Sequence, residues 1–95
     1  MEQVDRIKQE VSEYARRNSY LIPYEIYGNK RDLEHVIDIG TSIMCTKWEV
    51  GYPGGSFVQA VINNDLDEAV NRADMTCVEC LKFFSTLKNS LGYVN

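Results

Sequence analysis

Apolar residues recur at three- and four-residue spacing along most of the chain, which is the repeat of one face of an α-helix. The first such stretch ends before Asn18, with Arg16 and Arg17 placed as the helix dipole favours. The second spans residues 31–48, and Asn29 stands at its N-cap position. The apolar faces of these two predicted helices are Val4, Ile7, Val11, Tyr14 and Ala15, and Leu33, Val36, Ile37, Gly40, Ile43, Met44 and Trp48.

A glycine interrupts the apolar face of the second predicted helix. Gly40 lies inside this helix, where glycine costs about 1 kcal/mol relative to alanine. A glycine kept on a packed helix face despite this cost is typical of a place where two backbones approach each other closely. We therefore expect another helix to cross the second helix closely at Gly40.

Residues 20–27 join the first two helices and contain three tyrosines. They suit a short strand, but Pro23 argues against a central strand because it donates no backbone hydrogen bond. The alternative is a helical turn with Pro23 in its first positions. We expect an irregular or short helical connector whose tyrosines cover the core, ended by Gly28 and Asn29.

Turn-forming residues gather after the second helix. Residues 51–55 contain three glycines and a proline, which predicts a turn. A first short helix follows, with Ser56 or Gly55 as its N-cap, and it ends at residues 63–64. Asp65 begins a second short helix in a capping-box spacing. The two short helices therefore hinge at residues 63–65.

One further helix completes the predicted fold. Thr76 is its expected N-cap, Glu79 gives the capping-box spacing, and Gly92 is its terminator. The pattern thus predicts an all-α fold, a compact bundle of about five helices, two of them short. At 95 residues the chain is expected to form one domain, spanning residues 1–95.

Composition narrows the classes of function. Apolar residues make up 44% of the chain and charged residues 25%, which indicates a folded rather than a disordered protein. The net charge of −4 opposes direct binding to nucleic acid or to an anionic membrane. The N-terminus lacks a signal-peptide core, so we expect a cytoplasmic protein. A core this small favours a homo-oligomer.

The cysteines and the single histidine are the residues that a metal or catalytic site would use. Cys77 and Cys80 have the C-x-x-C spacing and, with Cys45 and His35, offer four zinc ligands. Only one ligand pair is present, however, and His35 and Cys45 project from nearly opposite faces of one helix. A redox or nucleophilic motif requires flanking features that this chain lacks. The sequence therefore predicts no metal, no cofactor, no catalytic residues and reduced thiols.

The glycine-rich turn is the candidate ligand site. Free N–H groups at a helix start favour an anion, and adjacent glycines let a phosphate approach the backbone. A sharp turn with Ser56 as a plain cap explains the glycines equally well, but no capping rule requires Tyr52, Arg72 or Asp74. The candidate ligand-binding residues are Tyr52, Gly54, Gly55, Ser56, Arg72 and Asp74.

The same stretch carries a resemblance to a known group. Its motif is Pro53-Gly54-Gly55-Ser56-Phe57-Val58-Gln59-Ala60-Val61, Asn63-Asn64-Asp65-Leu66, Glu68-Ala69 and Arg72-Ala73-Asp74. It resembles a pattern of small bacteriophage and prophage proteins, P-G-G-F-[LV]-x-A-[VL]-x-N-[ND]-L-x-[ED]-A-x-x-R-A-D, which one more helix follows. Ser56 stands here as an insertion before the phenylalanine.

The resemblance implies a phage accessory protein that works in the host cytoplasm. Small acidic phage proteins without enzymatic activity often act against host immunity. We expect this chain to sequester a nucleotide-like small molecule, as a sponge for a cyclic nucleotide signal does. The alternatives are a protein–protein inhibitor of a host defence protein or complex, and a phage regulatory or structural subunit.

Overall fold

The fold is all-α, as the sequence predicts. The computed structural model describes residues 2–92, and within them every regular element is helical. The expected connector consists of a 3-10 turn and one short α-helix, whereas the last helix, expected as one, is split in two. The elements are α1 (Glu2–Arg17), the 3-10 helix η1 (Ser19–Leu21), α2 (Tyr24–Tyr27), α3 (Lys30–Lys47), α4 (Ser56–Ile62), α5 (Leu66–Arg72), α6 (Met75–Glu79) and α7 (Leu81–Ser90).

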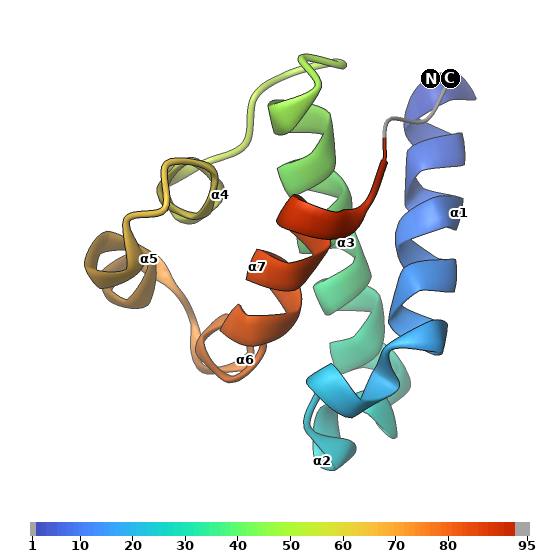
Figure 1. The fold of residues 1–95 in the computed structure, drawn as a ribbon. Helices are drawn as coiled ribbons and strands as arrows, with labels where there is room; N and C mark the ends of the chain where they lie inside the picture. Colours follow the sequence, from blue (N-terminus) through green and yellow to red (C-terminus); the bar gives the residue numbers. More distant parts are fainter. Residues whose placement is uncertain (1, 93–95) are drawn as a thin grey trace.

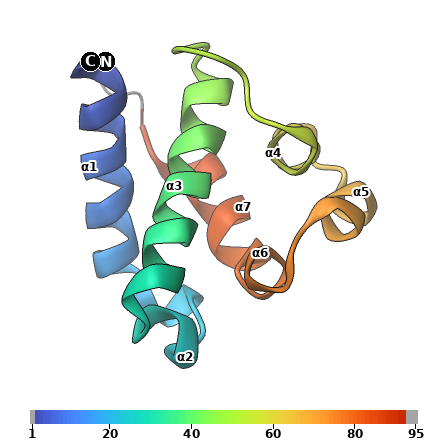
Figure 2. The same ribbon diagram turned by 180° about the vertical axis from the view of Figure 1, so that it is seen from behind.

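Helix α3 is the centre of the bundle. It runs antiparallel to α1, and the two long helices lie side by side in both views (Figures 1 and 2). Helix α7 packs across one face of α3, and α4 and α5 form the side of the molecule away from α1 (Figure 1). Because α2, α4 and α6 also contact α3, residues on α3 can meet residues from most of the chain.

Three pairs of aromatic rings connect the elements around α3. Phe83 and Phe84 of α7 are completely buried, and their ring centroids lie 5.7 Å apart. Phe83 faces Tyr14 of α1 at 6.1 Å, and Phe84 faces Phe57 of α4 at 5.7 Å. Tilted and edge-on ring pairs at these distances add to the free energy gained by burial. Helix α7 therefore joins α1 on one side to α4 on the other.

The close crossing expected at Gly40 is confirmed. A Cβ atom at this position would lie 3.0 Å from Leu87 Cδ2 and 3.0 Å from Val11 Cγ1. Both α1 and α7 therefore approach the α3 backbone at the same point. A larger side chain would push them apart, because protein cores are close-packed.

A buried lysine fixes the turn between α4 and α5. Lys88 of α7 donates from Nζ to the Val61 carbonyl oxygen at 3.1 Å and to Asn64 Oδ1. Asn64 adopts a left-handed backbone with φ 59°, a conformation that asparagine tolerates better than most residues. Burial lowers the pKa of Lys88, and nearby Lys47 adds to that effect. The two hydrogen bonds compensate for part of the cost of burying an ammonium group.

The connector is a short helical segment, as predicted, and Tyr27 packs against the core, but the other two tyrosines do not cover it. Pro23 is the N-cap of α2. Ile22 and Ile26 are the buried residues, whereas Tyr20 and Tyr24 are 79% and 86% exposed. The apolar isoleucines take the inward positions because burial favours them over side chains with a polar tip.

The start of the last helical segment differs from the prediction. The N-cap of α6 is Asp74, whose side chain accepts a hydrogen bond from the Cys77 backbone N–H, and not Thr76. Aspartate caps a helix more strongly than threonine does. The helix that was expected to be continuous is interrupted at Cys80, which is both the C-cap of α6 and the N-cap of α7. By contrast, Asn29 and Asp65 cap α3 and α5 as predicted.

Within residues 2–92, the helices are too short or too polar for any of them to cross a membrane.

Candidate functional site

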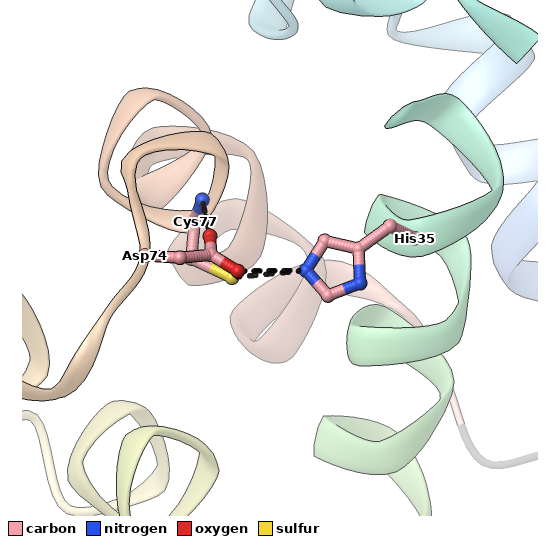
Figure 3. Close-up of side chains that lie close together, drawn as sticks. All are labelled: His35, Asp74 and Cys77. Atoms are coloured by element: carbon pink, nitrogen blue, oxygen red, sulfur yellow. Dashed lines mark hydrogen bonds and ion pairs between the residues drawn. The ribbon is translucent and has the colours of Figure 1, made fainter. Parts of the chain in front are cut away.

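Three side chains with metal-binding and acid–base chemistry converge between α3 and α6. His35 Nε2 lies 3.0 Å from Asp74 Oδ2 and 3.9 Å from Cys77 Sγ. The three potential donor atoms all lie within 4.8 Å of one another. Figure 3 shows the imidazole of His35 extending from α3 toward the other two side chains. We call these three residues the His–Asp–Cys cluster.

The helix cap of α6 orients two members of the cluster. Asp74 Oδ1 accepts the Cys77 backbone N–H at 2.8 Å, which holds the carboxylate at the helix start. The second oxygen, Oδ2, is therefore turned toward His35 (Figure 3). The cap also places Cys77 in the first turn of α6, where its side chain is buried.

Burial and hydrogen bonding shift the pKa values of Asp74 and Cys77 in opposite directions. The backbone hydrogen bond from Cys77 lowers the pKa of Asp74, and the hydrogen bond with His35 lowers it further. Burial, reinforced by the Asp74 carboxylate, raises the pKa of the Cys77 thiol to about 12. Burial likewise raises the pKa of Cys80 to about 11. At neutral pH Asp74 is therefore ionised, and both thiols are protonated.

This geometry differs from that of a cysteine–histidine nucleophile. In such a site the base contacts the nucleophile through one ring nitrogen and an orienting group through the other. Here Asp74 and Cys77 both approach the same atom, Nε2 of His35. The raised pKa of Cys77 also withholds the thiolate that a nucleophile requires. The arrangement instead suits shared donation by three atoms to one cation.

The cluster overlaps only in part with the zinc ligands that the sequence offered. His35 and Cys77 come together, but Cys80 and Cys45 lie outside the cluster within the described residues. Both are buried. Asp74 takes part in their place. The D-x-x-C spacing of an N-cap and its first turn is the signal that points to this residue.

The glycine-rich turn is used for packing. The Gly54 N–H donates to Thr46 Oγ1 at 2.8 Å. A Cβ atom on Gly54 would lie 2.6 Å from both Ser42 Oγ and Val58 Cγ1. Gly55, the N-cap of α4, has open space around it. Gly54 therefore lets the turn lie against α3, and its N–H is already paired.

The other candidate ligand residues have separate surroundings. Tyr52 is 95% exposed, and Ser56 begins α4. Arg72 donates from Nε to Glu68 Oε1 at 2.6 Å, and Asp74 belongs to the His–Asp–Cys cluster. Across residues 2–92, no hydrogen bond or ion pair joins Arg72 or Asp74 to the turn at 52–56. A shared ligand site on these residues stays a prediction.

A second surface feature lies at the connector. A hollow of about 670 Å³ opens beside η1 and α2. Tyr20 and Tyr24 line this hollow and are largely exposed to solvent. Lys82 of α7 also lines it and carries a positive charge. We call it the tyrosine groove. Its lining residues are Ser19, Tyr20, Leu21, Ile22, Pro23, Tyr24, Tyr27, Glu79 and Lys82.

Comparison with protein-family models, with curated proteins and with solved structures finds no match for this chain. The resemblance of residues 53–74 to small phage proteins therefore stays a prediction. The function has to be argued from the contacts of the chain itself.

The two adjacent glycines give a matched pair of variants. Gly54→Ala should lower the free energy of unfolding by about 1–3 kcal/mol because the added methyl group overlaps its neighbours. Gly55→Ala should cost less than about 1 kcal/mol, since only a weaker N-cap results. Urea unfolding followed by circular dichroism measures both values. Equal losses in the two variants would contradict the packing described for Gly54.

The thiols provide a test of the site's chemistry. At pH 8, Cys77 and Cys80 should react with iodoacetamide at least about 100-fold more slowly in the folded protein than in urea, because thiolate is the reactive form. The free energy of unfolding should also fall as the pH rises above 9, where only unfolded thiols ionise. Mass spectrometry resolves the rate at each cysteine. Rapid alkylation of native Cys77 would restore the nucleophile interpretation.

Proposed function

We propose that this chain is a non-catalytic binding protein of the phage accessory type, which counters host immunity by occupying a host defence protein. The observation that supports this function best is the tyrosine groove. It combines an apolar hollow with two tyrosine rings that stand almost fully in solvent. Tyrosine is enriched in protein–protein interfaces, where it supplies both contact area and a hydrogen-bonding hydroxyl.

The exposed tyrosines stand on a well-anchored base. Buried Ile22 and Ile26 hold the connector on the core. Backbone hydrogen bonds close both of its helical turns, from the Ile22 N–H to the Ser19 carbonyl at 3.0 Å and from the Tyr27 N–H to the Pro23 carbonyl at 3.0 Å. A preorganised aromatic surface loses little conformational entropy on binding.

Charge indicates the chemistry of the partner. The chain has a net charge of −4, and Glu79 lines the groove together with Lys82. Glu25 lies next to Tyr24 on α2 and is exposed. An acidic protein is drawn to a basic protein surface and is repelled by nucleic acid. We therefore propose a basic segment of a host defence protein as the occupant of the groove.

Capture of a nucleotide-derived signal is the competing version of the same function. It requires the glycine-rich turn to present free N–H groups to a phosphate. Gly54 already donates its N–H to Thr46, and Arg72 is paired with Glu68. Both contacts would have to be exchanged for contacts to a ligand, so the protein-binding version is favoured.

Two sets of exposed tyrosines distinguish these versions. The double variant Tyr20→Ala/Tyr24→Ala should keep its fold but lose at least about tenfold in affinity for the purified partner, since truncated aromatic anchors typically cost more than 1 kcal/mol. Tyr52→Ala, which removes a tyrosine that is also exposed but lies outside the groove, should bind as the wild type does. The partner is first captured from cells that carry a defence system, and affinity is then measured by calorimetry.

Three other outcomes would contradict this proposal. Unchanged affinity in the double tyrosine variant would remove the groove from the interface. Heat on titration with cyclic oligonucleotides, lost in both Tyr52→Ala and Arg72→Ala, would support the nucleotide version. A dimer in native mass spectrometry that the double tyrosine variant makes monomeric would show that a second copy of the chain fills the groove.

A further inference from the structure

We propose that His35, Asp74 and Cys77 form a binding site for a divalent transition-metal ion of the zinc type, with one coordination position open to solvent. The proposal does not depend on the tyrosine groove, because the cluster and the groove share no residue.

The two separations measured from the histidine nitrogen are within about 0.4 Å of those around a tetrahedral ion. Zinc lies about 2.0–2.1 Å from nitrogen, 2.0–2.2 Å from oxygen and 2.3 Å from sulfur, so the nitrogen–oxygen and nitrogen–sulfur edges of the tetrahedron are about 3.4 and 3.6 Å. The corresponding distances from His35 Nε2 are 3.0 Å to Asp74 Oδ2 and 3.9 Å to Cys77 Sγ. Small side-chain shifts are enough to admit the ion.

The protein already orients the ligands. Asp74 Oδ1 is engaged by the Cys77 backbone N–H, which leaves Oδ2 as the single oxygen available to an ion. A hydrogen bond of this kind to a ligating carboxylate is a regular part of metal sites and raises their affinity. His35 is carried by α3, the most extensively packed helix of the fold. The site is therefore built on fixed elements.

The donor set selects the class of metal. One cysteine sulfur, one imidazole nitrogen and one carboxylate oxygen suit zinc and its neighbours, whereas magnesium and calcium prefer oxygen alone. The Cys77 thiol binds as a thiolate, so one proton is released to solvent for each ion bound. The side chains of His35 and Asp74 are 42% and 57% exposed, so water can reach the fourth position. Among the described residues, Cys80 lies outside the cluster, so it does not supply the fourth ligand in this arrangement.

The ion would join two distant parts of the chain. His35 and Asp74 are 39 residues apart in the sequence, and the described contacts of the cluster link α3 to the start of α6. An ion bound to the folded state alone stabilises that state. We therefore expect zinc to hold the junction of α5 and α6 against α3.

Cobalt(II) is the probe for this site, because a thiolate bound to it gives a charge-transfer absorption. The reduced protein, titrated with cobalt chloride, should develop this band with an end point of one ion per chain, and zinc should abolish it. Asp74→Asn keeps an N-cap side chain but loses the carboxylate, and should weaken binding roughly tenfold or more, since even outer-shell losses cost about 10- to 100-fold.

Asp65→Asn is the matched control, since Asp65 caps α5 through the same kind of bond, from the Glu68 N–H at 3.1 Å. It should bind cobalt as the wild type does. His35→Gln, at a half-exposed position, should weaken binding with an unchanged circular dichroism spectrum. A wild-type protein without the thiolate band, or equal affinities in Asp74→Asn and Asp65→Asn, would overturn the proposal.

Discussion

The structure depends on one close crossing, in which α1 and α7 both meet the α3 backbone at Gly40. Val11 and Leu87 occupy the space that a side chain there would need. This crossing makes α3 the axis of the bundle (Figure 1). It also lets the buried phenylalanines of α7 contact rings of α1 and α4. His35 precedes Gly40 on the same helix, and its position is therefore set by the core.

Asp74 connects this core to the chemistry of the surface. One of its oxygens caps α6 and the other faces His35. A residue that is needed for a helix start is thereby also available as a metal ligand, and the cap fixes its orientation. In the tyrosine groove, too, one segment serves both the core and the surface. Buried Ile22 and Ile26 anchor the connector, and Tyr20 and Tyr24 of the same connector face solvent.

Local patterns were sufficient to predict the all-α class, the glycine-rich turn and the close approach at Gly40. The spacing of apolar residues and the destabilising effect of a glycine inside a helix can both be recognised within a short segment. The same patterns placed the cap of α6 at Thr76, which is wrong, since Asp74 two residues earlier also has a suitable side chain and caps the helix. The meeting of His35 with Cys77 was not predictable, because the two residues are 42 positions apart and approach only when α6 folds against α3. The sequence could offer these ligands but not their arrangement.

X-ray absorption at the zinc edge of the zinc-loaded protein tests most directly whether the His–Asp–Cys cluster binds metal. We expect one sulfur at about 2.3 Å and the remaining ligands, nitrogen and oxygen, at about 2.0–2.2 Å. Two sulfurs would show that Cys77 and Cys80 bind as a C-x-x-C pair after rearrangement of α6. A shell without sulfur would show that the ion binds elsewhere. Either result would contradict the arrangement in Figure 3.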